Sequence, residues 1–161
     1  MRPLTSVERQ LLIREYPEVA ASVPDIASSS TQVIQTAQTR SLAAVPTATK
    51  CNTYSGWATM KSLLGFTLYK FTHKATACSN GAKVTSHTQP TFTLDNVDPT
   101  VDNWNVVDKS VSGVNTATST SRIQVRVQQC VVKAGCYALH YPVGTIAAKA
   151  NNTATITTAP R

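Results

Sequence analysis

The most regular pattern in the sequence is Arg122-Ile123-Gln124-Val125-Arg126-Val127-Gln128. Its aliphatic residues alternate with charged and amide residues, and a period of two is typical of a strand with one buried face. We therefore expect Ile123, Val125 and Val127 to point into a core, with the arginines and glutamines facing outward.

Short runs in which Thr, Val and aromatic residues alternate with polar residues recur from Cys51 to the end of the chain. A tight-turn signal, Ser79-Asn80-Gly81, should reverse the chain between two of them, because Asn and Gly tolerate the positive φ of a short hairpin turn. Seven or eight such runs in about 110 residues predict an all-β fold, either an antiparallel β-sandwich or a closed barrel. The strands are expected at residues 52–61, 66–78, 83–88, 91–94, 104–108, 122–132, 137–148 and 153–158.

The beginning of the chain has a helical pattern instead. Thr5 and Glu8 have the spacing of a capping box. Apolar residues follow at helical intervals until Pro17 ends the run, namely Val7, Leu11, Leu12 and Tyr16. A helix of about ten residues is marginal in isolation, so we expect it to dock on another surface.

The segment after the helix is polar. Residues 27–49 are rich in Ser, Thr, Ala and Gln, which favours an extended linker or arm over a packed element. The expected division is residues 1–45, a short helix with a flexible or partner-docking arm, and residues 46–161, a disulfide-stapled β-sandwich domain.

Composition and charge exclude several classes of protein. The chain has 161 residues, of which 42% are apolar and 14% are charged. This low charged fraction, against about 25% in typical domains, excludes a coiled coil. No run approaches the roughly 18 apolar residues of a membrane span. The net charge of +7 arises after residue 45, largely from singly spaced lysines. Nucleic-acid binding would require Arg-rich stripes with interleaved aromatics, so it is not expected, whereas acidic cell-wall glycans are compatible partners.

The cysteines indicate disulfides. There are four, Cys51, Cys78, Cys130 and Cys136, and their spacing lacks the close pairs of a zinc site. Three pairings are open. We favour Cys130 with Cys136, closing a hairpin, and Cys51 with Cys78, tying two strands together. Disulfides indicate an oxidising compartment and hence a secreted protein, whereas the alternative is four buried free thiols in a cytosolic protein.

The sequence has no pattern typical of a catalytic centre. All three glutamates lie within the first eighteen residues, which leaves only aspartates for the two carboxylates of a glycosidase. The histidines, His73, His87 and His140, have no second ligand or base at a useful spacing, and no Gly-x-Ser-x-Gly motif occurs. We therefore expect a non-enzymatic protein with no catalytic residues and no cofactor.

Two groups of residues are candidates for binding. Asp95, Asp98 and Asp102 lie on one Asn- and Pro-containing segment and form a weak calcium candidate, although their spacing fits no calcium-loop template. Trp57, Trp104 and Tyr141 are candidates for stacking on sugars or docking on a protein, with core packing as the alternative for the tryptophans.

Three segments carry a resemblance to known proteins: residues 57–69, residues 78–84, and the pair Cys130 and Cys136 ahead of His140-Tyr141-Pro142. Together they resemble small secreted actinobacterial proteins of uncharacterised function, in which a helical segment precedes a four-cysteine β domain. The resemblance implies a secreted β domain over residues 50–160, with no catalytic residues to carry over. Some small exported β proteins of such bacteria are adaptors in secreted toxin assemblies, which makes that role an expectation here.

The leading hypothesis is a secreted, non-enzymatic protein-binding or structural module, such as an adaptor or assembly subunit of an extracellular toxin-like complex. Its N-terminal arm would dock on another secreted protein by strand addition or as a helix in a groove. The alternative is a carbohydrate- or cell-wall-binding module that uses Trp57, Trp104 and Tyr141.

Overall fold

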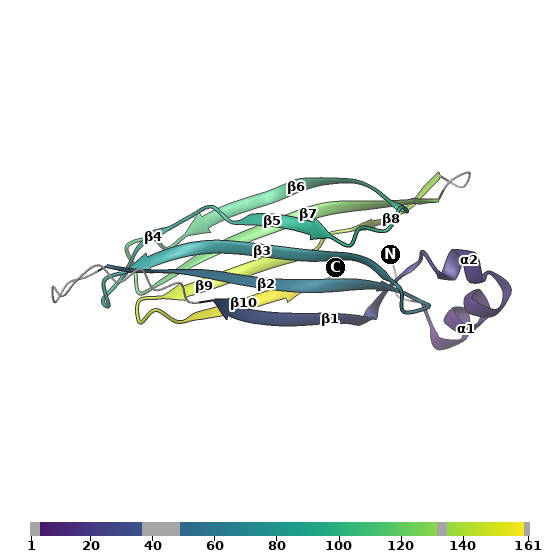
Figure 1. Cartoon of the computed structure of the whole chain (residues 1–161), viewed down its shortest axis with the longest axis horizontal. Helices are drawn as coiled ribbons and strands as arrows, with labels where there is room; N and C mark the ends of the chain where they lie inside the picture. The colour runs from purple at the N-terminus through teal and green to yellow at the C-terminus, as the bar shows by residue number, and fades with distance from the viewer. Residues whose placement is uncertain (1–3, 37–48, 132–134, 160–161) are drawn as a thin grey trace.

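A computed structural model describes residues 4–36, 49–131 and 135–159 of the chain. In this part of the chain, two short helices precede ten strands that form two antiparallel sheets (Figure 1). The elements are α1 (Ser6–Glu15), α2 (Pro17–Ala20), β1 (Pro24–Thr36), β2 (Lys50–Ser62), β3 (Thr67–Ser79), β4 (Val84–His87), β5 (Thr91–Asp95), β6 (Val101–Ser112), β7 (Thr118–Val131), β8 (Gly135–His140), β9 (Val143–Lys149) and β10 (Ala154–Ala159). The predicted all-β fold is confirmed. Neither described helix is long and apolar enough to cross a membrane.

Each sheet contains five strands. Sheet A runs β1-β2-β3, and β4 and β5 pair in turn with the far side of β3. Sheet B runs β10-β9-β7-β6. β8 and β9 lie end to end on the same side of β7, where β9 pairs with its first half and β8 with its last residues. The sheets lie face to face, with β2 against β10 and β3 against β9. The fold is therefore a sandwich, and the described strands do not close into a barrel.

The core lies between the sheets. Ile123, Val125 and Val127 of β7 are at most 1% exposed, so the alternation predicted the inner face of this strand correctly. One cluster joins these three side chains to Met60, Leu68, Tyr69, Phe71 and Val101. A second cluster, farther along β2 and β3, consists of Tyr54, Ala75, Ala77, Val84, Ile146, Ala148 and Ile156.

The segment expected to be a linker or arm contains a strand of the sandwich. Residues 24–36 form β1, which pairs with β2 at the edge of sheet A. Ladder hydrogen bonds are made by the backbone, so a polar segment that includes β-branched residues such as Val33 and Ile34 can pair without a strongly apolar composition. The sandwich therefore begins at residue 24, and the expected boundary between residues 45 and 46 does not separate it from an arm.

The strand expected at residues 137–148 is two strands. Tyr141 and Pro142 separate β8 from β9, and a proline has no N–H with which to continue a ladder. The Pro142 carbonyl instead accepts a hydrogen bond from the Val125 N–H at 3.1 Å. This break, together with the additional β1, raises the number of described strands above the seven or eight expected.

Candidate functional site

The N-terminal helix α1 is formed by local signals. The Thr5 hydroxyl accepts a hydrogen bond from the Glu8 N–H at 3.3 Å, and the Glu8 carboxylate accepts one from the Thr5 N–H at 2.8 Å. This is the capping box that the sequence predicts. At the other end, the Tyr16 N–H donates to the Leu12 carbonyl at 2.9 Å, and Pro17 begins α2.

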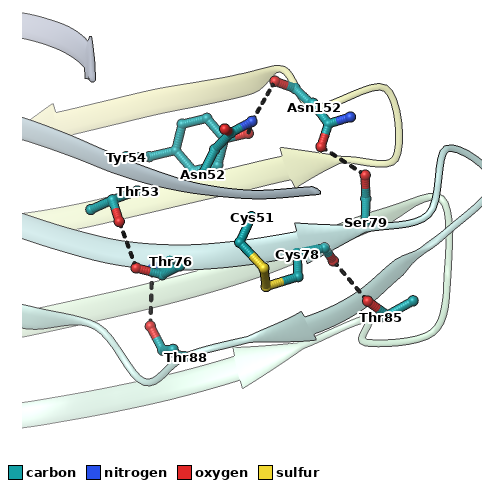
Figure 2. The surroundings of a disulfide bond; sticks show 10 residues. All are labelled: Cys51, Asn52, Thr53, Tyr54, Thr76, Cys78, Ser79, Thr85, Thr88 and Asn152. Atoms are coloured by element: carbon teal, nitrogen blue, oxygen red, sulfur yellow. Dashed lines mark hydrogen bonds between the residues drawn. A yellow bond between two sulfur atoms is a disulfide. The ribbon is translucent and has the colours of Figure 1, made fainter. Parts of the chain in front are cut away.

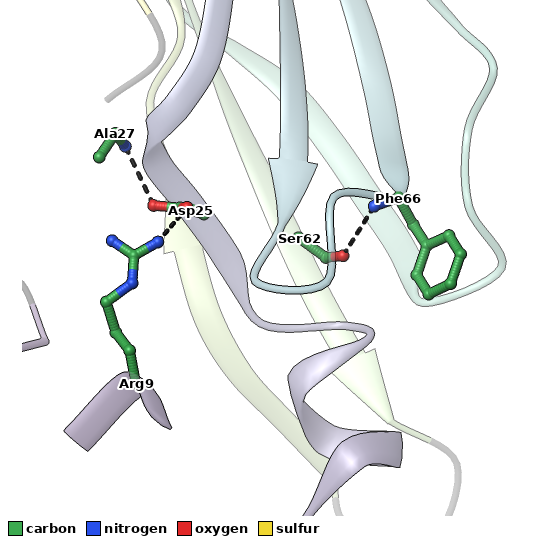
Figure 3. A network of polar contacts seen from close by, with 5 residues as sticks. All are labelled: Arg9, Asp25, Ala27, Ser62 and Phe66. Carbon is green, nitrogen blue, oxygen red and sulfur yellow. Dashed lines mark hydrogen bonds and ion pairs between the residues drawn. The ribbon is translucent and has the colours of Figure 1, made fainter. Parts of the chain in front are cut away.

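Helix α1 stands apart from the core. None of its ten residues is buried, and the side chains of Val7 and Leu11 are 73% and 51% exposed. Figure 1 shows both helices beyond one end of the sandwich. Arg9 forms an ion pair with the buried carboxylate of Asp25, which also accepts a hydrogen bond from the Ala27 N–H at 3.1 Å (Figure 3). A polar contact therefore connects α1 to the start of β1, and among the described residues no side chain of α1 belongs to the buried core.

The β2–β3 turn lies next to the second helix. The Leu63 N–H donates to the Val23 carbonyl at 2.8 Å, just after α2, and the Ser62 hydroxyl accepts from the Phe66 N–H at 3.1 Å (Figure 3). We define the helical end by the exposed apolar side chains of α1, α2 and this turn. They are Val7, Leu11, Ile13, Tyr16, Val19, Leu64 and Phe66. This end therefore presents apolar groups to solvent.

A second surface is the outer face of sheet A. Its groove, of about 550 Å³, is lined by Thr53 and Ser55 of β2, Lys74, Ala75 and Thr76 of β3, and Thr88, Gln89 and Thr91 at the start of β5 and just before it. The Thr53 and Thr76 hydroxyls lie 2.8 Å apart, and the Thr88 hydroxyl accepts from the Thr76 N–H at 2.9 Å (Figure 2). The lining is rich in hydroxyl groups and contains one ammonium group.

Trp57 lies on the same outer face, beyond the groove. The Lys70 ammonium sits over its ring, 4.6 Å from the centroid, in a cation–π contact. Lys70 therefore covers one face of the ring, which would otherwise be free to stack on a neutral sugar.

The three aromatic candidates do not form one patch. Trp57 is on the outer face of sheet A, whereas Trp104 on β6 is opposite the buried Val127 in sheet B. Tyr141 follows β8, two strands away from Trp104. Trp104 is nevertheless 43% exposed, because β6 is the edge strand of its sheet.

The cysteines form the favoured pairs. Cys51 is bonded to Cys78 across β2 and β3, and Cys130 to Cys136 across β7 and β8, and no cysteine is free. The alternative of four free thiols is therefore wrong. The carboxylate of Asp102 lies 3.8 Å from the Cys130 sulfur, but a disulfide sulfur has no thiolate to offer a metal.

The calcium candidates make local contacts and do not form a shared site among the described residues. Asp98 accepts hydrogen bonds from the N–H and hydroxyl of Thr100 at 2.9 and 2.6 Å, and Asp95 accepts one from the Thr93 hydroxyl at 3.1 Å. Within the described ranges, Asp95, Asp98 and Asp102 are not gathered within ligand distance of one another. Turn formation accounts for the Asp98 carboxylate, whereas the Asp95 carboxylate contacts a hydroxyl of its own strand.

The histidines are interior groups. His73 is 1% exposed and its Nε2 lies 2.9 Å from the Thr158 hydroxyl of the opposite sheet. Burial lowers the pKa of His73 to about 4 and that of His140 to about 4. Burial also lowers the pKa of His87, against a smaller opposing effect of its hydrogen bond to Ser119. All three are therefore neutral at pH 7 and covered by the sandwich.

A glycine slot explains how one of these rings fits. A Cβ at Gly144 would overlap the His73 ring, and a Cβ at Gly56 would lie 3.2 Å from its Nε2. The two glycines come from opposite sheets, so each sheet leaves room for the imidazole between them.

No protein-family model, curated protein or solved structure matches the chain. Its function must therefore be inferred from the surfaces themselves.

Proposed function

We propose that this protein is a secreted, non-enzymatic module that binds another protein through its helical end. One observation carries the proposal: α1 buries none of its residues, although it presents the apolar side chains of Val7, Leu11 and Ile13. Such an arrangement is favourable when a partner covers the helix, and an amphipathic helix in an apolar groove is a common way for proteins to bind.

The energetics favour docking over a free helix. A ten-residue helix is below the length of about 12–15 residues at which isolated helices become stable in water. A capping box contributes on the order of 1 kcal/mol and a surface ion pair at most about 1 kcal/mol. Burying one Val or Leu side chain contributes about 1.5–3 kcal/mol, so covering Val7 and Leu11 would outweigh both terms.

The disulfides support secretion. Two cystines with no free thiol suit an oxidising compartment, in which reduction does not compete with their formation. We extend the proposal to an adaptor or assembly subunit of an extracellular toxin-like complex, on the basis of the resemblance carried by residues 57–69 and the four cysteines.

Two features support a role without catalysis. The histidines are enclosed between the sheets and are out of reach of a substrate. The Asp98 carboxylate is engaged in a turn and the Asp95 carboxylate in a contact within β5, so neither is a free general acid or base in a cleft. The alternative of one carbohydrate-binding patch made by all three aromatic residues is weakened, because Trp57 lies on sheet A and Trp104 on sheet B.

Affinity capture from the native secreted fraction tests the proposal. The bait is the full chain, and the test variant carries Val7→Ser and Leu11→Ser, which change only exposed side chains of α1. Val107→Ser is the matched control, because Val107 is 52% exposed on β6, away from α1. We expect a stoichiometric protein partner with the full chain and the control, and its loss with the α1 variant. Equal retention by all three baits would contradict docking through α1.

A chain starting at residue 46 is not a suitable bait. It would lack β1 and expose the neighbouring β2 edge of sheet A, so a loss of binding could report a damaged sandwich. A chain starting at residue 17 removes α1 and leaves every strand in place.

A further inference from the structure

We propose that the groove on the outer face of sheet A binds an acidic polysaccharide, a chain of sugars that carries carboxylates. This site is separate from the helical end and is independent of the proposed protein-binding role. The inference rests on the chemistry of the lining, on the rigidity of the floor and on the net positive charge of this face, where Lys70 and Lys74 outnumber Asp95.

The lining matches a hydrated, hydroxyl-bearing ligand. Thr53, Ser55, Thr76, Thr88 and Thr91 provide hydroxyls, and Gln89 provides an amide. The Thr53 and Thr76 hydroxyls bond each other, and the Thr88 hydroxyl accepts from a backbone N–H, which leaves part of their hydrogen-bonding capacity for a ligand. Ala75 is the sole apolar residue of the lining. A pocket for an apolar small molecule would be lined mainly by hydrophobic and aromatic side chains, so this groove suits a polar polymer.

The floor of the groove is held rigid. The Cys51–Cys78 disulfide joins β2 to β3 immediately beyond Thr53 and Thr76, as Figure 2 shows. The Thr88 hydroxyl, in the segment before β5, accepts a hydrogen bond from the Thr76 N–H of β3 and so connects that segment to the floor. A site that is already ordered loses less conformational entropy when a ligand binds.

The charge of this face is positive. Lys70 and Lys74 lie on the outer side of β3, and Asp95, in register with Lys70, is the carboxylate on the neighbouring β5. Lys74 is exposed, and neither lysine has an ion-pair partner within hydrogen-bonding distance among the described residues. On the outer face of sheet B, by contrast, Arg122 is paired with Asp108.

The spacing of the lysines favours a polymer. Four residues along a strand separate the two Cα atoms by roughly 13 Å, a spacing that suits two carboxylates of one extended ligand better than a single small anion. A sugar chain with repeated carboxylates can occupy the groove beside Lys74 and extend along β3 toward Lys70. Lys70 covers one face of the Trp57 ring. We therefore expect a ligand to be recognised here by charge and hydroxyl contacts and not by stacking on this ring.

Nucleic acid is a poorer match to the same surface. The groove contains no arginine for bidentate phosphate contacts and no free aromatic ring for base stacking.

The test is titration calorimetry of the full chain with oligogalacturonate, with its fully methyl-esterified form as the uncharged ligand and polyphosphate as a second polyanion. The variants are Lys74→Gln and Lys70→Gln. The matched control is Lys149→Gln, an exposed lysine at the end of β9 in sheet B. We expect oligogalacturonate to bind, the ester to bind much more weakly, and Lys74→Gln to weaken binding by about tenfold, as for the loss of one charge-assisted hydrogen bond. The control should bind like the unaltered protein.

Four results would overturn the proposal. No binding of oligogalacturonate would show that the groove is not such a site. Equal binding of the ester would show that carboxylates are not recognised. An equal loss with Lys149→Gln would indicate attraction to net charge alone. Tighter binding of polyphosphate would assign the face to phosphate polymers. None of these results bears on docking through α1, which the capture experiment tests separately.

Discussion

The sandwich and the helical end differ in what stabilises them. In the sandwich, Phe71, Tyr69 and Val125 are at most 1% exposed, and every strand packs against or pairs with others of the same chain. In α1 no residue is buried, and its described contacts include a capping box, an ion pair with Asp25 and the neighbouring helix α2. The difference is the basis for our proposal that α1 docks on a partner, whereas the core of the sandwich is formed by its own strands.

The largest expected effect is on the sandwich core. Phe71→Ala removes a fully buried ring from the cluster around Val125 and should lower the free energy of unfolding by about 4 kcal/mol. Urea denaturation followed by tryptophan fluorescence measures this loss. A change below about 1 kcal/mol would contradict a close-packed core between the sheets.

The two disulfides should contribute unequally. Cys51 and Cys78 are 27 residues apart, whereas Cys130 and Cys136 are 6 apart. Because each disulfide restricts the unfolded chain, we expect the double serine variant of the first pair to lose about 3.5 kcal/mol of stability and that of the second pair about 2.2 kcal/mol. Denaturation of both variants measures the difference. A larger loss of stability on removing the second disulfide would contradict the view that the disulfides stabilise the fold by restricting the unfolded chain.

Acid should destabilise the sandwich. Above pH 6.5 His73 is neutral in both the folded and the unfolded chain, so it adds no pH dependence there. Below pH 6.5 the unfolded chain binds a proton that folded His73, with its pKa of about 4, does not. Stability should therefore fall between pH 6.5 and 4, by about 3 kcal/mol from this residue alone.

Substitution isolates this contribution. His73→Gln cannot titrate and retains a donor for the Thr158 hydroxyl, so its stability should depend less steeply on pH over the same interval. Free energies of unfolding at a series of pH values measure both slopes. Parallel curves for the variant and the unaltered protein would show that His73 is not responsible.

Much of the sandwich could be predicted from the sequence, because its signals are local. The alternation at residues 122–128 follows from the pleat of a strand, and it identified the buried face of β7 correctly. Residues 24–36 were not recognised as a strand, because an edge strand needs backbone partners more than apolar side chains. The pairing of this segment with β2 depends on the tertiary structure and cannot be predicted from the composition of the segment.

The candidate sites could be predicted only in part. Trp57, Trp104 and Tyr141 are each exposed to some degree, yet sheet topology separates Trp57, on sheet A, from Trp104, on sheet B. The groove was missed, although the favoured Cys51–Cys78 pair contained a signal for it. Once these cysteines are opposite each other on antiparallel strands, the register places Thr53 opposite Thr76 and Ser55 opposite Lys74. The rest of the lining, Thr88, Gln89 and Thr91, is positioned by tertiary structure and could not be predicted from the cysteine pairing.

The smallest expected effect on stability is at the helical end. Leu11→Ser should change the free energy of unfolding of the isolated protein by less than about 0.5 kcal/mol, because the side chain is 51% exposed and belongs to no core. The same denaturation experiment as for Phe71→Ala applies. A loss above about 1.5 kcal/mol would show that α1 already packs on its own chain.

Hydrogen exchange tests most directly whether α1 is completed by a partner. It should be measured on the isolated protein and on its complex with the captured partner. We predict that amides of α1 exchange rapidly in the isolated chain and slowly in the complex, whereas amides of β7 are protected in both. Protection of α1 equal to that of β7 in the isolated chain, or a complex in which α1 gains no protection, would contradict the account.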